Sequence, residues 1–376
     1  MGFNNVKTIL ISQFALPFSG IGSWTTMYKY YLSQNNHKID VIIAPPAKEE
    51  LENVTYFSLN YTFLDKVERK LTGNGYLKIF KILKEIIKPS EKYIIQIIDN
   101  HGLVLPLDAY LKKEQLRNSC YLQFFYHGYP PFLGNFESRT FFAALDEHIV
   151  LTLDSYKAHQ KGYTTLPCSF NVLHNGVNSE QFYTLNKKEK STLRNTYKIP
   201  DSKLIFIWCS QDRPKKGLDL ILKVWKQLML NYDGIELWII GSTRVVNVQQ
   251  VKNIGRVPNN EIAHYYQLAD FYVYPSLCHE GFGLTLVEAL KCGCYCIASQ
   301  NGGIPEVLQY GKYGKLIEHP NIISNWVAEI EKSIEEYLKN DKINPYFEAV
   351  PKDVYALNTW CDNMNTIIEK ANFWMK

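Results

Sequence analysis

The chain has 376 residues, which is enough for two hydrophobic cores, and its apolar fraction of 46% is ordinary for a globular protein. The formal net charge of +4, from 41 basic and 37 acidic residues, is too small to indicate a nucleic-acid-binding protein. No apolar stretch reaches the roughly 18 residues of a transmembrane helix and no signal peptide is visible, so we expect a cytoplasmic protein.

The first half of the chain alternates strand-like and helical segments. A helix is expected at 23–34, after a glycine-bearing loop at 15–22. Short apolar runs predict strands at 7–14, 38–43, 93–98, 121–126, 148–151 and 171–174. This alternation predicts a parallel, doubly wound α/β sheet.

Segment 76–92 (YLKIFKILKEIIKPSEK) carries apolar residues and lysines at helical spacing. The pattern predicts an amphipathic helix with its lysines in water. The alternative is a helix that lies on an anionic membrane, which would place the protein peripherally on the inner face of the membrane.

The alternation breaks at 176–200, which holds no clear strand and carries Lys187, Lys188 and Lys190. We therefore predict a first domain at 1–178, a linker at 179–200 and a second domain at 201–352. The C-terminal helix, 353–376, is expected to pack back on the first domain.

The second domain repeats the same alternation. Strands are predicted at 203–208, 235–240, 251–254, 271–274 and 295–298. Helices are predicted at 216–230, 259–268, 283–292, 322–339 and 353–373. Two doubly wound, Rossmann-like domains of this kind place a central cleft between the carboxyl ends of their sheets, where ligands bind.

The eight cysteines are expected to be free thiols, as is usual in a cytosolic chain. The cluster Cys292-Gly293-Cys294-Tyr295-Cys296 has no further His or Cys at a zinc spacing, so we do not predict a metal site. Instead, Gly293 is expected to cap a helix that ends at Cys292, and Cys294 and Cys296 to open a buried strand.

The segment from Glu280 to Glu288 (EGFGLTLVE) follows a predicted strand and opens a predicted helix. Glycines at a helix N-terminus let the backbone approach an anion, which the free N–H groups and the helix dipole bind. A carboxylate on each side of such a site can accept hydroxyls on both sides of a diphosphate. By itself, the spacing also fits an ordinary strand–loop–helix junction.

The longer segment HEGFGLTLVEALKCGCYCIASQNGGIPEVL (279–308) resembles the signature of retaining glycosyltransferases of the GT-B fold, the large "group one" family. Other segments resemble motifs of the same family in the same order. They are His174 to Asn178 followed by Phe182, Lys216 to Asp219, Leu237 to Gly241, Gly255 to Val257 and Leu268 to Asp270. The resemblance covers about 170–320 and is only topological before that.

The resemblance implies a role for each matching residue. Glu280 would face the donor sugar, Glu288 would hold the ribose hydroxyls, and Lys216 would contact the phosphates. Arg256 and Val257 would face the base. The backbone amides of the following residues would bind the diphosphate: Gly281, Phe282, Gly283, Leu284 and Thr285.

The chain departs from the family at Gln211, where an Arg five residues before the Lys is usual. Arg213 is a candidate replacement, because a guanidinium binds phosphate in a planar, bidentate way, and Lys215 is another. A solvent-exposed loop residue is the alternative interpretation of Arg213.

In the first domain the family has a glycine-rich loop that approaches the donor phosphate, and Gly20 and Gly22 match it. Because Thr25 stands where a dinucleotide fingerprint has its third glycine, that motif is excluded. His127 follows a predicted strand and is the first candidate for the family's His beside the donor sugar. His101 is the second, and a structural or capping histidine is the alternative for both.

The resemblance thus implies a metal-independent, retaining hexosyltransferase that needs no cofactor, with Glu280, His127, Lys216 and Arg213 as catalytic candidates. Its substrates would be a nucleotide-sugar, UDP-linked rather than GDP-linked, and a glycan or lipid-linked acceptor, in synthesis of a surface polysaccharide or glycolipid. The alternatives are a nucleotide-sugar epimerase of the same fold, a non-catalytic nucleotide-sugar-binding subunit, and a phosphorylase-like enzyme with pyridoxal phosphate. The sugar, base, acceptor, linkage and oligomeric state do not follow from the sequence.

Overall fold

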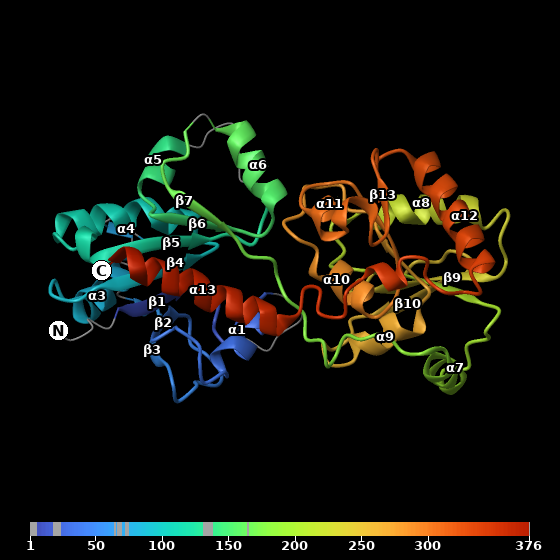
Figure 1. Cartoon of the computed structure of the whole chain (residues 1–376), viewed down its shortest axis with the longest axis horizontal. Helices are drawn as coiled ribbons and strands as arrows, with labels where there is room; N and C mark the ends of the chain where they lie inside the picture. The colour runs from blue at the N-terminus through green and yellow to red at the C-terminus, as the bar shows by residue number, and fades with distance from the viewer. Residues whose placement is uncertain are drawn as a thin grey trace. The chain divides into compact units, whose positions relative to one another are not determined.

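The computed structural model describes residues 6–17, 24–63, 65, 70–71, 75–130, 138–163 and 165–375. The chain divides into two compact units, the first formed by 1–174 with 358–376 and the second by 175–357. Each unit is built around one parallel sheet with helices on both of its faces (Figure 1).

In the first unit, the described strands form one sheet in the order β3-β2-β1-β4-β5-β6-β7. Their bounds are β1 (Lys7–Ser12), β2 (Val41–Ala44), β3 (Thr55–Ser58), β4 (Tyr93–Ile98), β5 (Cys120–Phe125), β6 (Glu147–Val150) and β7 (Ser169–Val172). The central strand β4, with sequence YIIQII, is buried at every position, as expected for a parallel strand that is covered on both faces.

Helices cover both faces of this sheet. On one face, Gln96 of β4 contacts the Tyr28 hydroxyl and the Met364 sulfur, which come from α1 and α13. Helices α3 and α4 pack against the other face in one hydrophobic cluster. The described helices are α1 (Thr25–Leu32), α3 (Leu77–Ile86), α4 (His101–Lys113), α5 (Ser138–Ala143), α6 (Leu153–Gly162) and α13 (Leu357–Met375).

The sheet of the second unit has the order β10-β9-β8-β11-β12-β13. Its strands are β8 (Leu204–Cys209), β9 (Ile235–Ile240), β10 (Val251–Gly255), β11 (Phe271–Tyr274), β12 (Tyr295–Ser299) and β13 (Lys315–Ile317). Its helices are α7 (Lys187–Thr196), α8 (Leu218–Leu228), α9 (Ile262–Leu268), α10 (Leu284–Lys291), α11 (Ile304–Val307) and α12 (Ile323–Lys339). Trp225 of α8 and Trp326 of α12 are fully buried against one face of the sheet.

The two strand orders confirm the prediction of two doubly wound sheets. In each sheet, the first strands are added from the centre toward one edge, and the later strands from the centre toward the other edge. The order reverses between β1 and β4 in the first sheet and between β8 and β11 in the second. Ligands of doubly wound sheets bind beyond the carboxyl ends of the strands at such a reversal.

The structure corrects the prediction of a linker at 179–200. That segment contains α7 and belongs to the second unit, where Arg194 of α7 binds Asp270. The helix begins with a capping box between Asn186 and Glu189. This local signal was not recognised because the segment is mostly polar. The prediction also omitted β3 and β13, two short strands at the sheet edges.

The cysteine cluster lies where the sequence places it. Cys292 is the C-cap of α10, Gly293 follows it with φ of 87°, and Cys294 and Cys296 are fully buried at the start of β12. All eight cysteines are free thiols.

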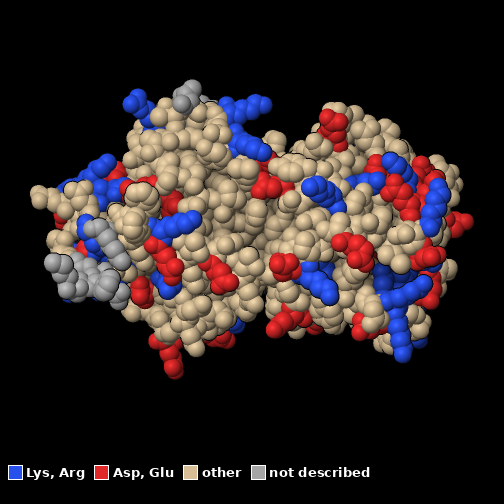
Figure 2. All heavy atoms as spheres, viewed as in Figure 1, with Lys and Arg blue, Asp and Glu red and all other residues tan. Residues whose placement is uncertain are grey.

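Two further observations bear on the surface. Among the described helices, none has the length and apolar character needed to cross a lipid bilayer. Figure 2 shows basic and acidic side chains interspersed over the face in view, which agrees with the small net charge.

A buried carboxylate holds α7 and α12 to the amino edge of the second sheet. Asp270, just before β11, accepts hydrogen bonds from both the Arg194 guanidinium (3.0 and 3.1 Å) and the Lys190 ammonium (3.0 Å). It also accepts from the Tyr337 hydroxyl and the Ile205 amide, each at 2.9 Å. Burial opposes its ionisation, but the neighbouring cations and hydrogen bonds outweigh it and hold the pKa of Asp270 below its ordinary value.

We predict that Asp270→Asn lowers the free energy of unfolding by about 3–5 kcal/mol, because the buried charge of Arg194 and the partly buried charge of Lys190 would lose their partner. Urea unfolding at neutral pH measures the loss. The exposed Asp233 offers a control, and Asp233→Asn should change little. Equal stabilities of the two variants would contradict the prediction.

Candidate active site

The candidate site lies at the carboxyl edge of the second sheet, where β8 and β11 are neighbours. The loop after β8 contains a short 3-10 turn, Pro214–Lys216, and leads into α8. The loop after β11 leads through Glu280 into α10. Both loops therefore start at the reversal of strand order, where the fold favours ligand binding.

An ion pair joins the two loops. Lys216 Nζ lies 2.6 Å from Glu280 Oε1, and the two side chains are 20% and 11% exposed. The Ser276 hydroxyl donates to the same oxygen at 2.5 Å, and the Cys278 thiol lies 3.6 Å from it. Tyr274 is also adjacent: burial, and then the charge of Glu280, raise its pKa, so its hydroxyl stays protonated.

Backbone contacts fix the loops against each other. Gly217 has φ of 73°, and a Cβ there would lie 1.9 Å from the Pro275 carbonyl oxygen, so only glycine fits. The Leu277 amide donates to the Lys215 carbonyl at 2.8 Å, and the Trp208 indole N–H donates to the Lys216 carbonyl at 3.1 Å. These backbone contacts set the position of Lys216.

The N-terminus of α10 follows directly. Gly283 is its N-cap, with φ of 89°, and no side chain caps the helix there. Leu284 and Thr285 begin the helix, and the Thr285 hydroxyl accepts a 2.8 Å hydrogen bond from Tyr272. Gly281 and Phe282 are buried just before it. An N-terminus without a side-chain cap suits an anionic ligand.

Glu288 lies one turn further into α10. It is partly buried, and the Tyr266 hydroxyl of α9 donates to its Oε2 at 3.3 Å. Burial raises its pKa to about 8, with only this hydrogen bond acting the other way. A carboxyl with so little internal compensation is a candidate for ligand contact.

The other predicted donor residues of this unit differ in exposure. Arg213 and Arg256 are exposed, and Val257 is buried. The loops after β9 and β10 are joined by a 2.7 Å bond from the Gly241 amide to the Gly255 carbonyl.

Several residues at this edge were not predicted. Arg244, in the loop after β9, binds Asp212 (3.1 Å) and Asp219 (2.7 Å), and Ser242 donates to Asp212 at 2.8 Å. Ser276 was also missed. Its only sequence signal is its place right after the strand end, four residues before Glu280.

In the first unit, His127 follows β5 and lies beside the end of β4. Its Nδ1 is 3.3 Å from the Asp99 carboxylate, and its backbone amide donates to Asp99 at 2.7 Å. The ring stacks on Trp24 at 4.4 Å, and Nε2 is buried without a hydrogen-bond partner among the described residues. Since Asp99 favours a proton on Nδ1, Nε2 is left as an acceptor. His101 begins α4, with its ring against Phe124.

Gly20 and Gly22 lie outside the described residues. Within the described part of the chain, no group of three His, Cys, Asp or Glu side chains has a metal-binding arrangement.

Residues 189–349 match the family model described as "Glycosyl transferases group 1". The matched range contains Lys216, Glu280 and Glu288, and it ends short of both chain termini.

Similar proteins of known name match parts of the chain. N-acetyl-alpha-D-glucosaminyl L-malate synthase of Bacillus anthracis is 26% identical over 192 residues, which are 45% of this chain and 50% of that protein. GDP-mannose-dependent monoacylated alpha-(1-6)-phosphatidylinositol monomannoside mannosyltransferase of Corynebacterium glutamicum is 28% identical over 155 residues, 37% of this chain and 41% of that protein. The chain spans half or less of the length of these two relatives.

Solved structures match almost the whole chain. Anabaena HepE in complex with UDP has a TM-score of 0.72 at 16% identity, covering 97% of this chain and 100% of that chain. Sucrose-phosphate synthase of Thermosynechococcus elongatus also has a TM-score of 0.72, at 15% identity, covering 97% and 98%. The likeness confirms the predicted fold, that of the GT-B glycosyltransferases with two Rossmann-like domains.

The raised pKa of Glu288 predicts a pH-dependent stability. Between the unfolded pKa of 4.5 and the folded value of about 8, the unfolded chain releases a proton that the folded carboxyl keeps. The contribution of this group to stability is therefore lost as pH rises through that window, by up to about 1.4 kcal/mol per pH unit. Glu288→Gln, which cannot ionise, should remove this slope.

Urea unfolding of wild type and Glu288→Gln at pH 5.5, 6.5, 7.5 and 8.5 measures the effect. The exposed Glu261 gives the matched control, since Glu261→Gln should leave the slope of wild type unchanged. A stability difference between wild type and Glu288→Gln that is constant with pH would refute the raised pKa.

Proposed function

We propose that this chain is a retaining glycosyltransferase of the group one type, which moves a hexose-type sugar from a nucleotide diphosphate sugar to a glycan or lipid-linked acceptor. The observation that carries the proposal is the Lys216–Glu280 pair beside the uncapped N-terminus of α10. This arrangement sits at the strand reversal of a unit that matches the group 1 family model.

The chemistry of the residues suggests how each part of the donor would bind. The diphosphate would lie against the N-terminus of α10, near Lys216, because the helix dipole and the ammonium both favour an anion. Glu280 would accept hydroxyls of the sugar, and Glu288 those of the ribose. The base would meet the loop after β10, at Arg256 and Val257.

The leaving diphosphate would gain charge as the glycosidic bond breaks. Backbone amides of α10, Lys216 and Arg213 would stabilise that charge, so the proposal requires no metal ion and no cofactor. In the retaining mechanism that we propose, the acceptor hydroxyl attacks on the face that the diphosphate leaves, and a departing phosphate oxygen takes its proton. In the first unit, His127, with Nε2 as an acceptor, is our candidate for binding a sugar hydroxyl.

The donor base is part of the proposal. Anabaena HepE was solved with UDP, whereas the mannosyltransferase of Corynebacterium glutamicum is named as GDP-mannose-dependent. We favour a uridine donor, as in the HepE complex. We favour a cell-surface polysaccharide or glycolipid as product, because the Corynebacterium glutamicum relative is named for a phosphatidylinositol glycolipid.

We predict that one nucleotide class, UDP-linked or GDP-linked, binds this chain, and that Glu288→Ala weakens its binding at least about 10-fold. Only the ionised carboxylate accepts two ribose hydroxyls, so binding by wild type should strengthen as pH rises from 6.5 to 8.5, through the pKa of about 8. Isothermal titration calorimetry with UDP, UDP-glucose, GDP and GDP-mannose measures both effects.

The exposed Glu261 again supplies the control, because Glu261→Ala should bind like wild type. If a well-folded wild type bound none of these nucleotides, the glycosyltransferase proposal would fail. Turnover distinguishes the remaining cases: transfer yields free nucleotide only when an acceptor is supplied, whereas an epimerase converts the donor alone and a non-catalytic subunit converts nothing.

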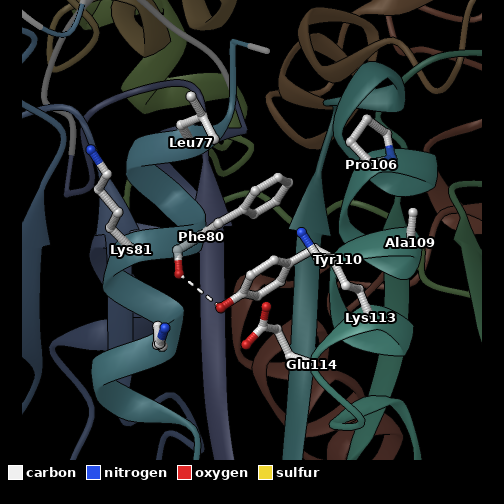
Figure 3. Close-up of a pocket in the computed structure, with 9 residues that line it drawn as sticks. Leu77, Phe80, Lys81, Pro106, Ala109, Tyr110, Lys113 and Glu114 are labelled. Carbon is white, nitrogen blue, oxygen red and sulfur yellow. Dashed lines mark hydrogen bonds between the residues drawn. The ribbon is translucent and has the colours of Figure 1, made fainter. Parts of the chain in front are cut away.

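We also propose that the first unit contacts the membrane through a groove between α3 and α4. Figure 3 shows Phe80 and Tyr110 between the two helices, with the Tyr110 hydroxyl bonded to the Phe80 carbonyl at 3.1 Å. The groove has a volume of about 460 Å³ and could take an acyl chain. It is lined by Leu77, Phe80, Lys81, Lys84, Pro106, Ala109, Tyr110, Lys113 and Glu114.

The three lysines at this groove should attract anionic lipid, each by about 1 kcal/mol. Lys84→Glu combined with Lys113→Glu should therefore lower binding to vesicles that contain phosphatidylglycerol by about 10-fold or more. Co-sedimentation measures this, and Lys223→Glu with Lys226→Glu, two exposed lysines of α8, is the matched control. Wild type that stays in the supernatant with anionic vesicles would refute the membrane contact.

A further inference from the structure

Three of the hydrogen bonds to Glu280 fall on one of its two oxygens, and the buried Tyr274 hydroxyl is a further partner of the carboxylate. Lys216 Nζ (2.6 Å), Ser276 Oγ (2.5 Å) and Cys278 Sγ (3.6 Å) all address Oε1. A carboxylate oxygen has two lone pairs, and the ammonium and the hydroxyl suffice to use both. Oε2 takes part in none of these three bonds.

The two strong donors to Oε1, Ser276 and Lys216, differ in how far their side chains can move. Ser276 is 1% exposed and is the second residue after β11. Its carbonyl accepts from the Asn301 side chain at 3.0 Å, and the next amide, of Leu277, is bonded to the Lys215 carbonyl. Lys216 has a long side chain that is 20% exposed. The serine hydroxyl is therefore a fixed contact, and the lysine ammonium a movable one.

The Ser276 hydroxyl can reach other acceptors, but none as close. The carbonyls of Lys215 and Cys278 lie 3.4 and 3.5 Å from Oγ, and the Cys278 sulfur lies 3.5 Å away. With a single proton to donate, the hydroxyl binds the carboxylate, because hydrogen bonds to a charged acceptor are shorter and stronger. The geometry therefore commits Ser276 to Glu280.

We propose that Ser276 is a positioning residue that holds Glu280 by Oε1, so that Oε2 keeps facing the donor sugar when Lys216 turns to the diphosphate. This inference rests on the proposed function. A diphosphate would draw the Lys216 ammonium away from Oε1, and Ser276 is the fixed donor that then remains on this oxygen. Without the serine hydroxyl, Glu280 follows Lys216 toward the phosphates and the sugar loses its acceptor.

The test compares Kd for a nucleotide with Kd for its sugar conjugate. We expect Ser276→Ala to bind UDP within about twofold of wild type, while the ratio of Kd for UDP-glucose to Kd for UDP rises about 10-fold. The same comparison uses GDP and GDP-mannose if guanosine is the base that binds. Ser276→Thr, which keeps the hydroxyl, should restore the ratio of wild type.

Ser299→Ala is the matched control. Ser299 ends the neighbouring strand β12, is fully buried, and its hydroxyl has no hydrogen-bond partner among the described residues. Its variant should keep the ratio of wild type.

The outcomes separate this inference from the function on which it rests. Wild type that binds no nucleotide would overturn the proposed function, and the role of Ser276 with it. If wild type binds and Ser276→Ala keeps the ratio, only the role of Ser276 is overturned. The role of Ser276 is also overturned if Ser276→Ala raises Kd for UDP and Kd for UDP-glucose by one common factor, because that result indicates a structural role. It is likewise overturned if Ser276→Thr binds UDP normally without restoring the ratio.

Discussion

The 2.6 Å ion pair between Lys216 and Glu280 joins two loops that lie 64 residues apart in the sequence, and the candidate site depends on it. The desolvation of two largely buried charges offsets most of their attraction, so the importance of this pair is geometric rather than energetic. The loops meet because β8 and β11 are neighbours at the strand reversal and because Gly217 leaves room for the Pro275 carbonyl. The fold thus brings a cation and an anion together at the edge where ligands bind.

Two carboxylates of the second unit show how differently the cost of burying a charge can be compensated. Asp270, at the amino edge, is surrounded by two cations, a hydroxyl and an amide, and its pKa is lowered. Glu288, beyond the carboxyl edge, has a single weak partner, and its pKa is raised to about 8. The first arrangement fits a structural role. The second leaves a carboxyl whose ionised form needs a partner that the chain does not supply, which is the property expected of a binding residue.

Much of the fold follows from local sequence, because alternating apolar runs and helical periods determine a doubly wound sheet. The β4 run and the EGFGLTLVE segment are examples: each shows its strand or helix N-terminus within a few residues. Short edge strands such as β13 and the polar helix α7 were missed, because edge pairing and contacts such as Arg194 with Asp270 are made by distant residues. The same reason explains Ser276, whose role depends on where a carboxylate four residues later is held.

The sequence motif alone also could not show what replaces the positive charge of the arginine that the family has at the position of Gln211. Asp212 is the next residue, and its charge would oppose a diphosphate. The structure places Arg244, from the loop after β9, 3.1 Å from the Asp212 carboxylate, with the Ser242 hydroxyl on the same group at 2.8 Å. That pairing offsets the negative charge of Asp212. Since Lys216 is paired with Glu280, Arg213 and Lys215 give the loop its net positive charge. An anion meeting this edge would therefore encounter a positive loop even without the family's arginine, and the balance depends on a residue that no motif includes.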